Sequence, residues 1–222
     1  MHRALILIFL CLAACGRPLT GPEAALADDL FGPSLDHGKI RIVEDAPLRS
    51  FTVRLPPRPR VTCQERVVPA RTGTLRVTPA GLVAFNAMFL SSDWSLADFV
   101  PGYPARVSLY ETMLFAHEMT HIWQWQNRAR TGYHPLKAAR EHLRSDDPYL
   151  FDPATDQPFL SYGYEQQASL VEEYVCCALL DPRGARTERL KEMISAEIPL
   201  GGLPQADTFI AWRDAPRGGL CS

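Results

Sequence analysis

Lysine, long apolar runs and charge of one sign are all scarce in this sequence of 222 residues. It has only three lysines against 20 arginines, and its formal net charge is −2. The arginines are scattered, so the chain lacks the basic block that indicates nucleic-acid binding. The apolar run Ala4–Ala14 holds 11 residues, whereas a transmembrane helix needs about 20. These shortages argue against a nucleic-acid-binding protein and against an anchor made of a membrane-spanning helix.

The first residues have the pattern of an export signal. His2 and Arg3 precede the apolar run, and the run ends in Leu12-Ala13-Ala14-Cys15. This ending resembles the lipobox of bacterial lipoproteins, in which the signal is cut before a cysteine that then carries lipid. We therefore expect residues 1–14 to be a signal peptide, residues 15–22 a short lipidated tether, and residues 23–222 a single domain. A glycine after Cys15 implies, by the same resemblance, an outer-membrane lipoprotein that faces the periplasm.

Export changes the interpretation of the remaining cysteines, because disulfides form in oxidising compartments. Four cysteines belong to the expected domain: Cys63, Cys176, Cys177 and Cys221. A bridge between the adjacent Cys176 and Cys177 would be strained, so each is expected to pair with either Cys63 or Cys221. The sequence leaves both connectivities open. The alternative is that all four are small buried side chains that never oxidise.

The local patterns predict an α+β domain with a small, mostly antiparallel sheet. Thr20 and Glu23 form a capping-box pattern that opens a helix through Leu30, and Gly32 can end it. Strands are expected where β-branched residues partly alternate between proline-rich turns, over Lys39–Val43, Ser50–Leu55 and Gly73–Thr78. The stretch 145–157 is rich in proline and aspartate and is expected to form a surface loop that could border a cleft.

A histidine motif lies in the longest predicted helix, which spans Val107 to about Arg130 without proline or glycine. His117 and His121 enclose an HExxH pattern, and this spacing places both imidazoles on one helical face, a single turn apart. Glu118 projects about 100° round the helix, where it can reach an activated water as a general base without ligating the metal. The alternative is a chance match on an ordinary helix.

A catalytic zinc site usually takes three protein ligands, so a third must lie elsewhere. The metzincin extension would need glycine at position 124 and histidine at position 127, but the chain has Gln124 and Asn127. A carboxylate from a second helix is then expected, and Glu165 is the best candidate. Glu172 and Glu173 are rivals, either as ligands or as partners that orient a ligand. The alternative is that these glutamates form a solvated helix face.

Two segments together carry a family resemblance. The run 115–124, followed by Tyr162 and by Glu165-Gln166-Gln167-Ala168, resembles the Vgr-related bacterial proteins and their metallopeptidase-type domains, which are associated with contractile injection systems. The resemblance covers roughly residues 23–180. It implies a zincin-like fold, matches Glu165 to the family's downstream glutamate and implies a secretion-system partner. The lipobox and the extra cysteines depart from the family pattern.

Other aromatic and titratable residues carry weaker expectations. Trp123 and Trp125 on the motif helix are expected to be core or interface anchors, and a substrate platform is the alternative. Five side chains could stabilise a developing oxyanion, although such residues in loops often have no chemical role: His134, His142, Tyr162, Tyr164 and Tyr174.

The sequence as a whole predicts an envelope-anchored zinc-dependent hydrolase with a zincin-like α+β fold. The long helix would supply His117, His121 and the base Glu118, and a second helix would supply Glu165. Zn²⁺ is the expected cofactor, and a metallopeptidase cleaving a peptide or another amide bond is the expected activity. Peptide or protein substrates, the membrane through Cys15, and an envelope or secretion-system partner are the expected contacts. The alternative is a non-catalytic lipoprotein whose structural zinc supports a binding or assembly module.

Overall fold

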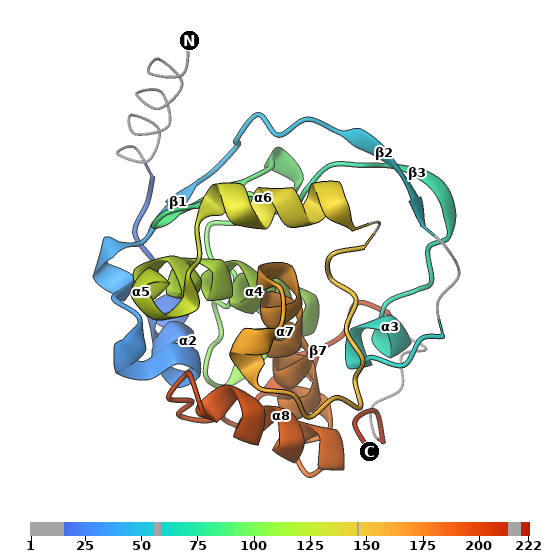
Figure 1. Ribbon diagram of the computed structural model, residues 1–222. Coiled ribbons are helices and arrows are strands. Elements are labelled where there is room, and N and C mark those ends of the chain that lie inside the picture. The colour runs from blue at the N-terminus through green and yellow to red at the C-terminus, as the bar shows by residue number, and fades with distance from the viewer. Residues whose placement is uncertain (1–15, 56–58, 146, 213–218) are drawn as a thin grey trace.

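Two long helices, α4 (Leu109–Gln126) and α7 (Tyr164–Leu180), pack against each other at the centre of the fold (Figure 1). The computed structural model describes residues 16–55, 59–145, 147–212 and 219–222. The expected signal peptide and Cys15 lie outside this part of the chain. Both helices bury residues around most of their circumference, as helices in the middle of a core do. The motif helix is therefore an internal element.

Smaller elements surround the central pair. The helices are α2 (Gly21–Phe31), α3 (Cys63–Val67), α5 (Arg128–Thr131), α6 (Pro135–Arg144) and α8 (Ala185–Ser195). Short 3₁₀ turns are η1 (Gly32–Ser34), η2 (His37–Lys39), η3 (Ser92–Trp94) and η4 (Phe159–Ser161). No helix within the described ranges combines the length and the apolar character that crossing a bilayer requires.

The predicted caps of α2 are confirmed. The Thr20 hydroxyl accepts a hydrogen bond from the Glu23 amide, and the Glu23 carboxylate accepts one from the Thr20 amide at 2.9 Å. Gly32 ends the helix with φ = 49°, a conformation that favours glycine. The Glu23 carboxylate is fully buried and also pairs with Arg17 at 2.7 Å. This pairing fixes the start of the described chain to the first helix.

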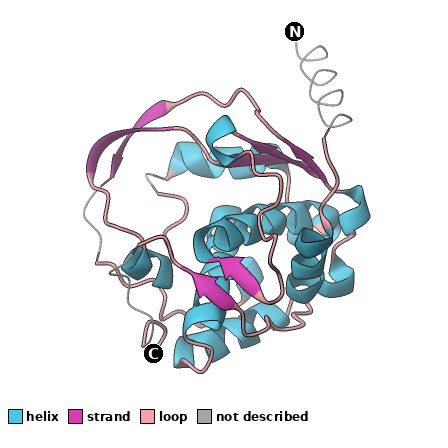
Figure 2. Cartoon of the chain, turned by 180° about the vertical axis from the view of Figure 1, so that it is seen from behind, coloured by secondary structure: helices cyan, strands magenta, loops and turns pink. Residues whose placement is uncertain are grey.

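In the described part of the chain the strands form three small sheets instead of one mostly antiparallel sheet, and Figure 2 shows them at separate places around the helices. The first joins β1 (Arg41–Val43), β5 (Ala87–Leu90) and β4 (Gly81–Ala84), with β1 parallel and β4 antiparallel to β5. The second pairs β2 (Phe51–Leu55) with β3 (Gly73–Val77) antiparallel, and the third pairs β6 (Arg106–Ser108) with β7 (Asp207–Phe209) parallel. The expectation of a single sheet was wrong because β1 pairs with the later strand β5, while β2 and β3 pair only with each other. The strands β4 to β7 were not predicted, since they are too short to produce an alternating pattern.

The motif helix is shorter than expected. It begins at Leu109, because Val107 belongs to β6, and it ends at Gln126. Asn127 caps this end, since its side-chain amide donates to the carbonyls of Ser34 and Trp123 at 2.9 Å each. These two bonds end α4 and direct the chain into α5.

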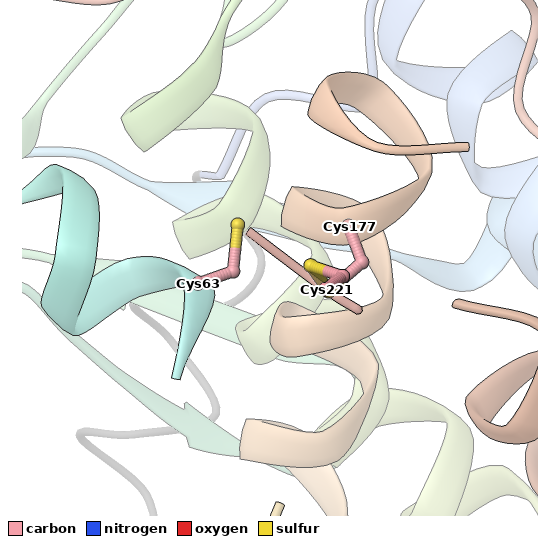
Figure 3. A group of neighbouring side chains, drawn as sticks. All are labelled: Cys63, Cys177 and Cys221. Carbon is pink, nitrogen blue, oxygen red and sulfur yellow. A yellow bond between two sulfur atoms is a disulfide. The ribbon is translucent and has the colours of Figure 1, made fainter. Parts of the chain in front are cut away.

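Two disulfides tie α7 to distant parts of the chain, which confirms the predicted pairing and gives its connectivity. Cys63 of α3 joins Cys176, and Cys177 joins Cys221 near the C-terminus. All four side chains are fully buried. Figure 3 shows Cys63, Cys177 and Cys221 close together beside α7. The bridges therefore hold α3 and the C-terminal residues against the helix that presents Glu165.

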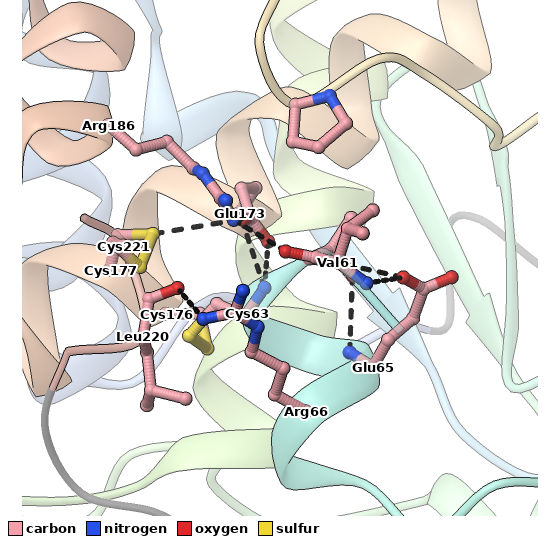
Figure 4. A network of polar contacts seen from close by, with 12 residues as sticks. Val61, Cys63, Glu65, Arg66, Glu173, Cys176, Cys177, Arg186, Leu220 and Cys221 are labelled. Carbon is pink, nitrogen blue, oxygen red and sulfur yellow. Dashed lines mark hydrogen bonds and ion pairs between the residues drawn. A yellow bond between two sulfur atoms is a disulfide. The ribbon is translucent and has the colours of Figure 1, made fainter. Parts of the chain in front are cut away.

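A buried ion pair reinforces the same junction (Figure 4). The Glu173 carboxylate accepts from the Cys63 amide at 2.8 Å and from the Arg186 guanidinium at 2.8 Å. Arg186 also donates to the carbonyl of Val61 at 2.8 Å. Removing one partner of such a buried pair would leave an uncompensated charge, so Glu173 has a structural role. This excludes it as a rival third ligand.

The connectivity is testable with paired serine variants. Cys63→Ser/Cys176→Ser removes one whole bridge and should leave no free thiol among the remaining two cysteines. Cys63→Ser/Cys177→Ser breaks both bridges and should leave two thiols. Each lost bridge should lower the free energy of unfolding by about 2–4 kcal/mol. Thiol labelling followed by peptide mapping, with denaturant unfolding, measures both effects. Two labelled thiols in the first variant would contradict the assigned connectivity.

Candidate metal centre

The structure brings His117, His121 and Glu165 together at the α4–α7 interface. One ligand atom from each lies within 4.8 Å of the other two, and all three residues are buried. A Glu165 carboxylate oxygen lies 3.4 Å from His117 Nε2 and 3.3 Å from His121 Nε2. Two imidazoles and one carboxylate are a donor set that Zn²⁺ accepts, with a further position left for water. The residues present therefore fit the ion that the motif implies.

The second nitrogen of each imidazole is held by its own partner. His117 Nδ1 lies 3.1 Å from Glu172 Oε2, and His121 Nδ1 lies 2.9 Å from the side-chain oxygen of Gln124. Such partners fix ring orientation and tautomer, so both Nε2 atoms are directed to the same point. Gln64 donates to Glu172 at 2.6 Å and holds that carboxylate in turn. Glu172 thus orients a histidine and does not compete with Glu165.

Helix α6 supports the third carboxylate. His142 Nε2 lies 3.0 Å from Glu165 Oε1. The Glu141 carboxylate accepts from the backbone amides of Tyr164 and Glu165 at 3.0 and 3.1 Å. It therefore caps the free amides at the start of α7, where the helix dipole also favours negative charge. Of the weaker candidates in the sequence, His142 is the one placed directly on a proposed ligand.

The contacts of the other four weak candidates are with residues other than the three converging side chains. His134 caps α6 by accepting from the Leu136 amide at 3.2 Å. The Tyr162 hydroxyl bonds Thr155, and the Tyr164 ring packs against Tyr133. Tyr174 is buried in the hydrophobic core. These contacts give each side chain a packing or capping role.

Glu118 lies beside this group and under the edge strand β4. Its side chain is buried, and a Cβ placed on Gly81 would lie 2.9 Å from its carboxylate carbon. A side chain at position 81 would therefore require the Glu118 carboxylate to move. Burial raises the pKa of Glu118 even though the neighbouring His117 and His121 act in the opposite direction. A carboxylate with a raised pKa is suited to accepting and returning a proton.

Protons and a metal ion compete for the same nitrogen atoms of the two histidines. Burial opposes their protonation, but the carboxylates of Glu165 and Glu172 outweigh it and raise the pKa of His117. The pKa of His121 is raised too, mainly by Glu165 against the effect of burial. Because a metal ligand must be the neutral imidazole, zinc affinity should fall as the pH is lowered through these raised pKa values.

A cleft of about 690 Å³ opens next to His117 and Glu118. The loop 147–151 contributes Tyr149, Leu150 and Phe151 to its lining, which agrees with the expectation that this proline-rich stretch borders a cleft. The Tyr149 ring lies 5.8 Å from the His117 ring and 5.5 Å from the His142 ring. Burial, with the nearby carboxylates, raises the pKa of Tyr149, so its hydroxyl stays protonated. Sequence reasoning missed this residue because nothing local distinguishes it.

The tryptophans of α4 do not line this cleft. Trp123 is fully buried, and its indole nitrogen donates to Ser34 at 2.9 Å, which confirms the core role. Trp125 is half-buried and packs against Phe85 at 4.7 Å between ring centroids. Both are anchors, and the alternative of a substrate platform finds no support.

A second cluster of potential ligands is formed by Cys63, Cys177 and Cys221, whose sulfurs lie within 4.8 Å of one another. Each is part of a disulfide. Metal binding by cysteine needs the thiolate, so the oxidised chain cannot use this cluster. The His/His/Glu group is therefore the candidate metal centre.

Comparison with known proteins gives two similarities and no match to a known protein-family profile. The chain is 28% identical over 166 residues to the type VI secretion system spike protein VgrG2b of Pseudomonas aeruginosa, covering 73% of this chain but 13% of that protein. The solved effector domain of VgrG2b superimposes with a TM-score of 0.51 at 23% identity, covering 82% of this chain and 84% of that one. The structural likeness shows a shared fold. Together the similarities link the chain to Vgr-related proteins of type VI secretion.

Metal content separates the proposed ligands from their supports. Alanine at His117, His121 or Glu165 should abolish stoichiometric zinc, because each substitution removes a donor. Glu172→Gln should keep zinc with affinity lowered by about 10–100-fold, as is typical for an orienting partner. Glu188→Ala on the exposed face of α8 is the control and should bind normally. Elemental analysis and competition with a chelator measure the effect. Full zinc retention in Glu165→Ala would refute its assignment.

Proposed function

We propose that the chain is an envelope-anchored zinc-dependent hydrolase, specifically a metallopeptidase that cleaves a peptide or another amide bond. The observation that carries the proposal is the convergence of His117, His121 and Glu165 beside Glu118 at the margin of an open cleft. Its similarity to a type VI secretion effector domain supports a role associated with secretion systems. The chain matches 13% of the spike protein, so that protein's other activities are not transferred.

The three converging side chains would hold Zn²⁺. A bound zinc ion supplies Lewis acidity that activates water and polarises the carbonyl of the scissile bond. Glu118 removes a proton from the attacking water as the water oxygen bonds to the carbonyl carbon. Glu118 then returns that proton to the leaving nitrogen as the carbon–nitrogen bond breaks. Its raised pKa suits both steps, because the same carboxylate must accept and release a proton.

Tyr149 is placed to assist at the carbonyl oxygen. Its ring borders the cleft beside His117, and its hydroxyl remains a donor at neutral pH. A hydrogen bond from this phenol would stabilise negative charge that develops on the carbonyl oxygen. His142 has a different role, because it bonds Glu165 and so positions a proposed metal ligand instead of contacting the substrate.

The alternative of a structural zinc site in a binding module is less well supported. Structural zinc is usually enclosed by four protein ligands. In the described residues the His/His/Glu group supplies three and adjoins the cleft, with Glu118 beside it. Anchoring by lipid on Cys15 and an outer-membrane location facing the periplasm remain part of the proposal. They rest on the sequence of residues 1–16.

The role of the base can be tested independently of metal binding. Glu118→Gln should retain zinc, because Glu118 is not among the proposed ligands. Its amide cannot take a proton from water, so hydrolysis should fall by about 10²–10⁴-fold. Cleavage of a quenched fluorescent peptide library, with zinc content measured in parallel, gives both readouts. The control Glu188→Gln makes the same chemical change on α8. Unchanged cleavage in Glu118→Gln would remove the proposed mechanism.

The role of Tyr149 predicts a separate effect. Tyr149→Phe removes the hydroxyl and keeps the ring, so zinc binding and folding should be preserved. The kcat should fall by about 10²-fold, the range seen when one donor to an oxyanion is lost. Tyr162→Phe is the matched control, because that hydroxyl bonds Thr155. A fall in both variants alike would assign the effect to packing.

A further inference from the structure

Helix α6 exposes apolar and basic side chains together on the side turned away from the core. The apolar side chains of Leu143 and Leu136 are 86% and 65% exposed to solvent. With about 100° between successive residues, these leucines share one stripe of the helix. Three exposed cations, Lys137, Arg140 and Arg144, form the adjoining stripe. We call these five residues the α6 outer face.

The opposite side of α6 faces the candidate metal centre. Ala138 is its buried residue, and Glu141 and His142 contact the first turn of α7. The outer face is therefore not a wall of the cleft, and within the described chain its leucines do not belong to the core. The exposed leucines therefore leave apolar area available for a contact outside this protein.

A cluster of aromatic residues lies next to the start of α6. His134 caps α6, and its ring centroid lies 6.4 Å from that of Trp125 in a T-shaped arrangement. The Arg128 guanidinium lies 4.3 Å above the same ring, and Phe85 packs against its edge. Phe85 is partly exposed in the turn between β4 and β5, where it has φ = 60°. Aromatic rings, leucines and cations at one boundary are the composition of protein surfaces that bind membranes.

The chain also enters the fold at this end of the molecule. Arg17 pairs with Ile42 of β1 through backbone hydrogen bonds of 2.9 and 2.8 Å. Both β1 and α6 lie at the upper end of Figure 1, whereas α8 lies at the lower end. Cys15, the residue expected to carry lipid, is two residues before Arg17 in the sequence. Lipid attached at that cysteine would bring the α6 end of the molecule towards the membrane.

We propose that the α6 outer face, together with Phe85 and Trp125, docks on a membrane surface that contains anionic phospholipid. The leucines and aromatic rings would enter the interfacial region, and the cations would bind the lipid phosphates. A second copy of the chain is a poorer occupant, because two such faces would oppose like charges. This inference goes beyond the proposed hydrolase function and does not depend on it.

Docking would also orient the candidate metal centre. The same helix that meets the lipid carries Glu141 and His142 on its inner side, where they hold the start of α7. The site would therefore lie at a fixed height above the membrane, facing substrates at the envelope surface. Bonds in proteins or peptides close to the membrane would be within its reach.

Hydrogen exchange of the full chain tests the docking. Without lipid, α6 should exchange quickly, because it is short and buries little. Vesicles containing phosphatidylglycerol should slow exchange in α6 but not in α8, and phosphatidylcholine vesicles should do so far less. Lys137→Gln/Arg140→Gln/Arg144→Gln should weaken docking by about 100-fold, since each cation near an anionic surface adds about fivefold. The protection should then be lost.

The matched control neutralises two cations near the other end of the molecule, Arg183→Gln/Lys191→Gln, and should keep the protection of α6. A second variant, Leu136→Ser/Leu143→Ser, tests the apolar part and should lower protection without changing zinc content. Equal exchange of α6 with and without anionic vesicles would overturn the proposal. So would protection that rises with protein concentration alone, because it would identify a second copy as the occupant.

Discussion

Burial of the Glu165 carboxylate between two imidazoles is the constraint on which the rest of the candidate site depends. A buried charge is costly unless it is paired and hydrogen-bonded. Burial raises the pKa of Glu165, but His121, His117 and His142 outweigh it and lower that pKa well below its usual range. The first turn of α7 must therefore stay fixed against α4. A divalent cation would satisfy the same carboxylate while releasing protons from the imidazoles.

The surrounding structure fixes both ends of α7. At its start, the Glu141 carboxylate caps the free amides, and the Gln124 side chain donates to the Tyr164 carbonyl at 3.0 Å. Towards its end, the disulfides of Cys176 and Cys177 attach it to α3 and to the C-terminal residues, and the ion pair of Glu173 with Arg186 attaches it to α8. These attachments limit the freedom of Glu165 before any ligand binds. Such preorganisation is what a metal site requires of its scaffold.

The sequence predicted the parts of the site that depend on local spacing. His117, Glu118 and His121 follow from one helical turn, and the caps of α2 follow from Thr20 and Glu23. The roles of more distant partners were not predictable in this way. Gln124 stands where a metzincin would have glycine, and only the packing of α7 shows that it orients His121. Tyr149 reaches the site through the path of a loop, which no periodic pattern records. The same holds for the short strands β4 to β7.

Helix α6 combines a local sequence pattern with contacts to distant residues. Its sequence has the pattern of an amphipathic helix, yet its polar residues Glu141 and His142 contact the start of α7, while Leu136 and Leu143 are exposed. The polar residues face inwards because His142 bonds the buried carboxylate of Glu165 and Glu141 caps the amides at the start of α7. The leucines are then free of the core and can serve a contact outside the protein. His142, which contacts Glu165, and the exposed Leu143 are neighbours in the chain. A contact made by Leu143 outside the protein would therefore act on the same helical turn that holds the Glu165 carboxylate.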